Sequence, residues 1–170
     1  RHPRHSTPHL THIHGNRAGC FDHINHRVLL ARVRARIADK KTVALVRAFL
    51  KAGVLDELGR QDGTDAGTPQ GGIISPLLAN IALSVLDEAV MAPWQPGGDQ
   101  ATQWARRKRV RHGLGNWRIV RYADDFVILT NGSRDDVLAL KEQVAEVLGG
   151  LGLRLSEAKT RITRTPDIAH

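Results

Sequence analysis

The feature that most restricts the fold is a pair of short apolar runs, residues 117–122 and 126–130, separated only by Ala123, Asp124 and Asp125. Runs rich in β-branched and aromatic residues, joined by so short a connection, predict a β-hairpin. Hairpin turns favour Asn-Gly or Asp-Gly, and two adjacent carboxylates repel one another. A divalent cation would neutralise such a pair, and carboxylate oxygens suit Mg²⁺ or Mn²⁺. Taken alone, the pair favours an exposed acidic turn without a function over a metal site.

Helical patterns precede the hairpin. Apolar residues recur at helical spacing between residues 25 and 55, and a charged break at residues 39–41 predicts two helices joined by a short turn. A third helix is expected from Ser75, the capping residue, to about Val90, because Pro76 suits a first turn.

The segment after the hairpin predicts a further helix over residues 135–148, ended by a group of glycines at 149, 150 and 152. Residues 153–155 and 160–163 then alternate like a bent strand or a pair of edge strands. No internal repeat is present, so this order of elements predicts one α+β domain.

The composition restricts the class of partner. The formal net charge is +8 and the pI about 10.5, which favours a polyanionic partner but leaves a merely soluble basic domain equally open. Cys20 is the single cysteine, so no internal disulfide is possible and a reducing cytoplasm is expected. Polar residues and a proline interrupt the apolar stretch over residues 71–92, which predicts a buried helix and no membrane partner.

Two segments have no hydrophobic period. Residues 1–14 hold five histidines and two prolines without an acidic or thiol partner, so we expect a disordered or non-homologous extension rather than a metal site, with the domain at residues 15–170. Residues 93–115 are polar and contain a basic cluster: Arg106, Arg107, Lys108, Arg109 and Arg111. A solvated insertion is favoured over a phosphate-binding patch there, because no aromatic residues are interleaved for base stacking.

Five blocks of the sequence resemble one protein family. Residues 121–127, Arg-Tyr-Ala-Asp-Asp-Phe-Val, resemble the Tyr-Ala-Asp-Asp signature of reverse transcriptases. Residues 67–81 resemble a block typical of the group II intron branch, and residues 19–26, 49–53 and 152–160 resemble three more. Because the order and spacing also agree, the chain resembles a group II intron-encoded reverse transcriptase and maturase over residues 19–163.

The resemblance implies a polymerase palm: a split βαβ (ferredoxin-like), mostly antiparallel sheet with helices on one face. It implies two Mg²⁺ or Mn²⁺ ions held by Asp124 and Asp125, which are then both metal ligands and catalytic residues. Lys159 matches the family's lysine near the triphosphate and is the third candidate catalytic residue. A solvated lysine at a strand end is the alternative.

Three further positions match substrate-binding residues of the family. Phe21 matches the side chain that packs under the incoming sugar and rejects a 2′ hydroxyl by bulk. Gln70 and Gly71 match the loop along the nascent base pair. A core phenylalanine and ordinary turn residues are the respective alternatives.

One departure from the family pattern bears on activity. Where the family has an aspartate that bridges both metals, four positions before Cys20, this chain has Asn16, followed by Arg17. A neutral amide is a poorer Mg²⁺ ligand than a carboxylate, and the adjacent cation should weaken binding further. His12, His14 and Arg17 also lower the apolar character of this expected strand, so it is predicted to be poorly formed.

Two functions are therefore expected. The first is an RNA-directed DNA polymerase that binds an RNA template, a DNA primer and a deoxynucleoside triphosphate, with intron RNA as a partner. The second is an inactive fragment or RNA-binding maturase remnant, supported by Asn16 and by the lack of any match to the family's fingers and thumb. A nucleotide cyclase with a similar palm is a third interpretation, but the block at residues 67–81 has no role there.

Overall fold

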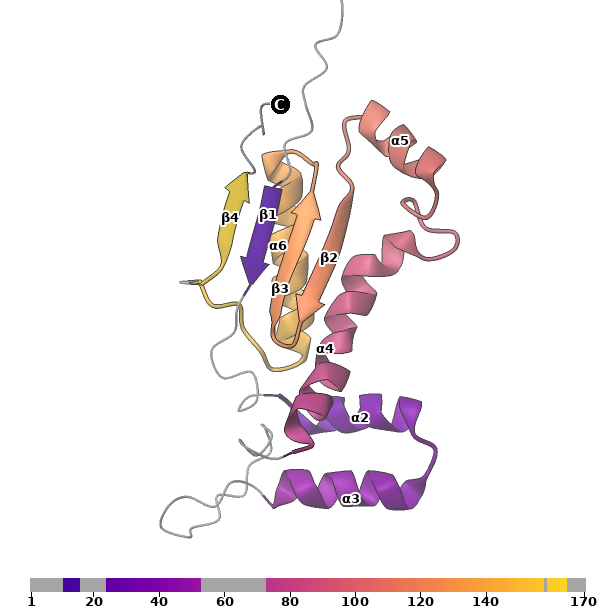
Figure 1. The fold of residues 1–170 in the computed structure, drawn as a ribbon, viewed down its shortest axis with the longest axis vertical. Coiled ribbons are helices and arrows are strands. Elements are labelled where there is room, and N and C mark those ends of the chain that lie inside the picture. Colours follow the sequence, from indigo (N-terminus) through magenta and orange to yellow (C-terminus); the bar gives the residue numbers. More distant parts are fainter. Residues whose placement is uncertain (1–10, 16–23, 53–72, 158, 165–170) are drawn as a thin grey trace, which may run out of the picture.

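The structure is a computed structural model, and it describes residues 11–15, 24–52, 73–157 and 159–164. Its centre is a four-stranded sheet in the order β2-β3-β1-β4, in which all neighbouring strands are antiparallel (Figure 1). The strands are β1 (Thr11–Gly15), β2 (Trp117–Tyr122), β3 (Asp125–Thr130) and β4 (Arg161–Arg164). One helical connection follows β1 and another follows β3, which is the ferredoxin-like βαββαβ arrangement. The expected α+β palm fold is therefore confirmed.

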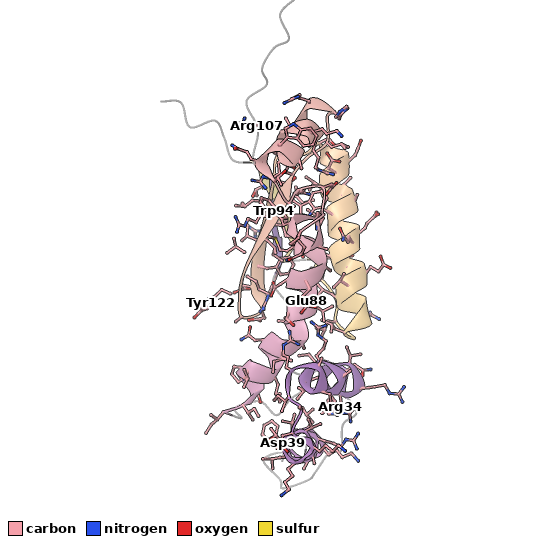
Figure 2. All side chains as sticks on the ribbon, turned by 90° about the vertical axis from the view of Figure 1, so that its right-hand side faces the viewer. Arg34, Asp39, Glu88, Trp94, Arg107 and Tyr122 are labelled. Carbon is pink, nitrogen blue, oxygen red and sulfur yellow. The ribbon has the colours of Figure 1, made fainter. Side chains whose placement is uncertain are left out.

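The helices lie on one face of the sheet and beyond both of its ends. They are α2 (His26–Arg36), α3 (Lys40–Lys51), α4 (Ser75–Met91), the short 3-10 helix η1 (Ala92–Trp94), α5 (Gln103–Arg111) and α6 (Arg134–Gly150). Figures 1 and 2 show α4 and α6 against the same face, with α2 and α3 beyond the end at which the β2–β3 turn lies. Ser75, expected as the cap of α4, is instead its first residue.

Strand β1 corrects two expectations. It pairs with β3, from Thr11 opposite Thr130 to Gly15 opposite Phe126, and with β4 on its other side. Residues 11–14 therefore belong to the sheet and are not a disordered extension. The strand is also not poorly formed, because pairing on both sides satisfies its backbone N–H and C=O groups whatever the local propensity.

The end of α6 corrects a third expectation. Gly149 and Gly150 remain helical, and the helix ends at Leu151, followed by Gly152 with φ +79°. The amides of Gly152 and Leu153 donate to the carbonyls of Gly149 and Leu148, both at 2.9 Å, which is a Schellman motif. Leu153 is consequently a buried part of this cap, and residues 153–155 form no strand, whereas the strand expected at 160–163 is present as β4.

The polar segment after α4 is more ordered than its sequence suggests. Helix α5 is capped by Thr102, whose Oγ1 accepts from the Ala105 amide at 3.1 Å. Arg109 pairs with Asp99 and donates to the Gly115 carbonyl at 2.8 Å, while the Arg106 guanidinium lies 4.6 Å from the Trp94 ring centroid. Two cations of the basic cluster thus hold the segment together, whereas Arg107, Lys108 and Arg111 remain exposed.

Helix α4 forms the middle of the core. By length and composition alone, residues 75–94 form a helix that would be able to cross a membrane. In the structure its apolar face is buried against α2, α6 and β2, through residues Leu78, Ala79, Ala82, Leu83, Leu86 and Val90. Its remaining polar positions determine how the hairpin is held.

Candidate catalytic hairpin

The β2–β3 hairpin carries the two candidate carboxylates on a very tight turn. Tyr122 pairs with Asp125, so the turn consists of only Ala123 and Asp124, and Asp125 is the first residue of β3 rather than part of the turn. Ala123 has φ +53°, the left-handed conformation that two-residue hairpin turns require. For a residue with a Cβ this conformation costs about 1 kcal/mol, so other contacts must hold the turn.

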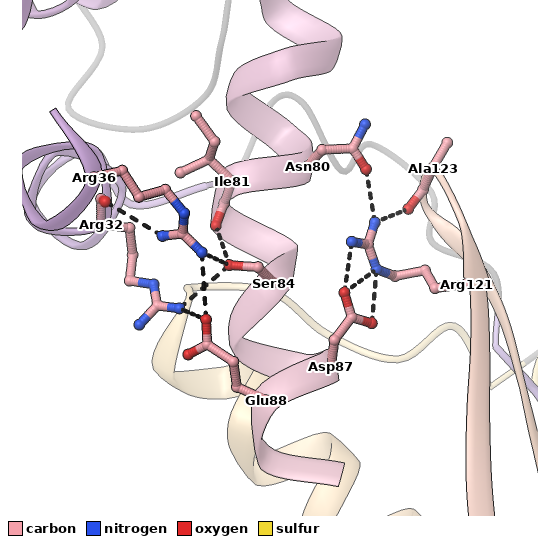
Figure 3. Close-up of polar contacts among 9 residues, drawn as sticks. All are labelled: Arg32, Arg36, Asn80, Ile81, Ser84, Asp87, Glu88, Arg121 and Ala123. Atoms are coloured by element: carbon pink, nitrogen blue, oxygen red, sulfur yellow. Dashed lines mark hydrogen bonds and ion pairs between the residues drawn. The ribbon is translucent and has the colours of Figure 1, made fainter. Parts of the chain in front are cut away.

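Arg121 supplies those contacts (Figure 3). Its Nε and Nη2 donate to the Asp87 carboxylate at 2.7 to 3.0 Å, and its Nη1 donates to Asn80 Oδ1 at 2.7 Å and to the Ala123 carbonyl at 2.6 Å. Asn80 and Asp87 are seven residues apart on α4, which places them on one face of that helix. One guanidinium therefore ties the strained turn residue to the central helix.

The opposite side of α4 carries a second arginine network, also visible in Figure 3. Glu88 pairs with Arg32 and, at 3.3 Å, with Arg36, and both arginines donate to Ser84 Oγ. The hydrogen bond from Arg32 is the main cause that lowers the pKa of the Glu88 carboxyl below its usual 4.5. Helix α4 thus connects α2 on one side with the hairpin turn on the other.

Three segments with candidate functional residues end at the same edge of the sheet. The hairpin turn lies there, and so does the end of β1, because Gly15 is opposite Phe126. The start of β4 also lies there, since Arg161 is opposite His14, and Lys159 precedes it by two residues. The amides of Lys159 and Thr160 donate to the Ser156 carbonyl at 3.1 and 2.8 Å, which forms a turn immediately before β4.

The donor set at this edge suits a hard divalent cation. Asp124 is half-buried and Asp125 is exposed, and both present carboxylate oxygens. Within the described ranges, no group of three or more histidine, cysteine, aspartate or glutamate side chains comes together. A two-carboxylate site of this kind fits Mg²⁺ or Mn²⁺ but leaves most of six ligand positions to water, substrate or other residues.

The structure covers only part of the predicted site. Asp124, Asp125 and Lys159 are described, whereas Phe21, Gln70 and Gly71 lie outside the described residues, as do Asn16 and Arg17. Arg121, Asn80 and Asp87 were not among the predicted site residues. Their signal was present in the sequence, because Asn80 and Asp87 are polar positions seven residues apart in a mostly apolar helix.

Comparisons with known proteins identify related sequences and structures. Residues 16–168 match the family described as reverse transcriptase (RNA-dependent DNA polymerase). Protein YkfC of Escherichia coli is 35% identical over 91% of this chain, and the group II intron-encoded protein LtrA of Lactococcus lactis is 33% identical over 92%. The chain spans 44% and 33% of the lengths of these two relatives.

Solved structures agree on the fold. Telomerase from Candida tropicalis, in complex with a fragment of telomeric RNA, superposes with a TM-score of 0.68 over 98% of this chain and 27% of its own. Apo telomerase from the same organism gives a TM-score of 0.67. Both are 14% identical to this chain, so they support the fold alone.

Proposed function

Because the chain belongs to the reverse transcriptase (RNA-dependent DNA polymerase) family, we propose that it forms the palm of an RNA-directed DNA polymerase of the group II intron type. The observation that carries this proposal is the convergence of the Asp124–Asp125 turn, the end of β1 and the start of β4 at one sheet edge. The proposed substrates are a DNA primer annealed to an RNA template and a deoxynucleoside triphosphate, with intron RNA as the natural template.

The proposed reaction is phosphoryl transfer to a primer end. The primer 3′ hydroxyl loses its proton to solvent, its oxygen forms a bond to the α-phosphorus of the nucleotide, the bond between the α-phosphorus and the oxygen bridging to the β-phosphorus breaks, and pyrophosphate leaves. Bound Mg²⁺ or Mn²⁺ would lower the pKa of the 3′ hydroxyl and offset the charge of the leaving group. Asp124 and Asp125 would hold the cations, and the Lys159 ammonium would neutralise triphosphate charge.

Arg121 has a positioning role in this scheme. It fixes the Ala123 carbonyl, one residue before Asp124, relative to α4. Since Asp124 lies in the two-residue turn and Asp125 follows it as the first residue of β3, movement of Ala123 would displace both carboxylates. Catalytic groups must be held within a fraction of an ångström of their productive position, which a strained turn without a clamp would not achieve.

A second candidate function is supported by Asn16. The position after the end of β1 carries an amide instead of the family's carboxylate, so the site has one acidic ligand fewer. An RNA-binding remnant without polymerase activity would have this composition, because the basic surface remains while the metal ligand is lost. This alternative predicts RNA binding without primer extension.

Primer extension on poly(rA)/oligo(dT) with Mg²⁺ or Mn²⁺ distinguishes the two functions. The wild-type chain is compared with Asn16→Asp and Asp124→Ala. Extension by the wild type that Asp124→Ala abolishes supports a polymerase that tolerates Asn16. Extension by Asn16→Asp alone identifies one missing carboxylate as the defect. Silence of all three, with RNA binding retained, supports the remnant and contradicts the polymerase.

A further inference from the structure

A concave surface separates helices α2 and α3. Two adjoining cavities, of about 490 and 360 Å³, lie between these helices and share Arg34 and Arg47, so they form one continuous groove. Its floor is apolar and includes Leu30, Ile37, Val43 and Leu50. We call this surface the α2–α3 groove.

Five cations line the α2–α3 groove: Arg27, Arg34, Lys40, Arg47 and Lys51. Arg27 and Arg34 are seven residues apart on α2, and the three on α3 are spaced by seven and four residues. These spacings place each set on one helical face, so the charges form two rows about 10 and 16 Å long. All five residues are exposed, although their stems bound the groove.

Among the described residues, no acidic group lining the groove balances this charge. Neither α2 nor α3 contains an aspartate or glutamate, and none lines the groove among the described residues. The nearby Asp39 caps α3, and its carboxylate accepts from the Thr42 amide at 2.9 Å and from the Thr42 hydroxyl at 2.6 Å, which lowers its pKa. Arg32 and Arg36, on another side of α2, are paired with Glu88. Helix α2 therefore has one arginine face that is paired with a carboxylate and one that is not.

We propose that the α2–α3 groove binds the sugar-phosphate backbone of RNA. Two rows of cations around a concave surface suit a chain of phosphates, and each neutralised phosphate releases a condensed counterion. No phenylalanine, tyrosine or tryptophan is among the lining residues, so the contacts are to backbone rather than to stacked bases, and binding is independent of sequence. The choice of RNA among polyanions rests on the proposed function.

The position of the groove relates the bound RNA to the hairpin. Helices α2 and α3 lie beyond the sheet end that carries the β2–β3 turn (Figure 1). Helix α2 is attached through Arg32 and Glu88 to α4, which holds the turn through Asp87 and Arg121. RNA in the groove would therefore lie at a fixed distance from Asp124 and Asp125.

The basic cluster of α5 provides a matched control. Arg107 and Arg111 are exposed cations four residues apart, and α5 also lacks acidic residues, but neither arginine lines the α2–α3 groove. Figure 2 shows Arg34 and Arg107 at opposite ends of the molecule. The double variants Arg34→Glu/Arg47→Glu and Arg107→Glu/Arg111→Glu change the net charge equally at these two ends.

Fluorescence anisotropy of labelled oligo(rA) with the full chain, in EDTA and without nucleotide, tests the proposal. We expect the groove variant to raise the Kd about tenfold and the α5 variant much less. The slope of log K against log salt should fall by about 1.4 for the groove variant, from two lost phosphate contacts on a single strand. Equal losses in both variants, or an unchanged slope in the groove variant, would overturn the proposal.

Two further measurements keep the test decisive. If circular dichroism shows that Arg34→Glu/Arg47→Glu does not fold, Arg34→Gln/Arg47→Gln replaces it, because this variant removes the two charges without reversing them. It should also weaken RNA binding. Vesicles of phosphatidylserine test the competing polyanion, and binding to them without binding to RNA overturns the proposal. The binding assay contains no metal or nucleotide, so its result does not depend on whether the chain extends a primer. Conversely, a failure to bind RNA through the groove would not decide whether the hairpin carboxylates catalyse primer extension.

Discussion

Arg121 and Asp87 form a two-pronged ion pair between strand β2 and helix α4, with Nε 3.0 Å from both carboxylate oxygens and Nη2 2.7 Å from Oδ2. The arginine side chain is 12% exposed and the aspartate 36%, so the pair is largely shielded from water. A planar guanidinium matches a carboxylate in this way, and a lysine does not. The pair fixes the direction in which the hairpin leaves the core.

Replacing Arg121 by alanine should lower the free energy of unfolding by about 2 kcal/mol, less than for a fully buried pair because Asp87 is partly exposed. Arg121→Lys should recover only a minor part, since it retains the charge but not the two-pronged geometry. Urea unfolding measures both. The control is Arg118→Ala, which removes an exposed guanidinium 5.2 Å from the Trp94 ring centroid and should cost about 0.5 kcal/mol. Equal losses at the two positions would show that the ion pair contributes nothing specific.

The positive φ of Ala123 gives a second prediction. A β-branched residue is strongly disfavoured at φ +53°, so Ala123→Val should lower the free energy of unfolding by about 1 kcal/mol or more. Ala123→Gly should stay within about 0.5 kcal/mol of wild type, because relief of strain offsets the entropy of glycine. The control Ala139→Val, on an exposed helical position of α6, should cost about 0.5 kcal/mol. Thermal or urea unfolding in which valine is tolerated better at 123 than at 139 would contradict the turn conformation.

The cap of α6 gives a pair of opposite effects. Gly152 has φ +79°, so Gly152→Ala should destabilise the fold by about 1 kcal/mol. Gly149 is helical, and a Cβ added there would meet nothing within 4 Å, so Gly149→Ala should stabilise by about 0.5 to 1 kcal/mol. We expect the urea midpoint of Gly152→Ala to lie below that of wild type and the midpoint of Gly149→Ala to lie above it. The same sign for both would show that the Schellman motif does not end this helix.

What the sequence predicts well in this chain is local. The hairpin, the paired helices α2 and α3, and the apolar helix α4 follow from periodicity and from short connections. Strand β1 does not, because its stability comes from pairing with β3 and β4, more than 100 residues away along the chain. Likewise, Arg121 is separated from Asn80 and Asp87 by 41 and 34 residues, and no local pattern pairs them. The clue lay in Asn80 and Asp87, two polar residues spaced to lie on one face of a mostly apolar helix.

The network around Glu88 predicts a pH dependence of stability. Its pKa is lowered in the folded state, chiefly by the hydrogen bond from Arg32, so the unfolded state binds the proton more tightly. The stabilisation is therefore fully present above the unfolded pKa of about 4.5 and is lost as the pH falls through the lower folded value. Glu88→Gln should lower the urea midpoint at neutral pH, and the difference from wild type should shrink in acid. The control is Glu142→Gln, at an exposed position of α6. The ion-pair assignment would be contradicted if the loss in urea midpoint for Glu88→Gln did not change with pH or was no larger than the loss for Glu142→Gln.

Metal affinity tests the hairpin carboxylates without requiring catalysis. Mn²⁺ binding, followed by the electron paramagnetic resonance signal of the free ion, should be weak in the wild-type chain, because the two hairpin carboxylates supply few of the six ligands. Asn16→Asp should tighten it by about tenfold or more, since Asn16 follows directly after the end of β1, whose last residue is opposite Phe126. Adding Asp124→Asn to that variant should remove the gain, whereas adding Asp135→Asn, an exposed carboxylate in the first turn of α6, should not. If Asp124→Asn leaves the gain intact, the added carboxylate binds Mn²⁺ away from the hairpin, and the proposed site at this sheet edge is wrong.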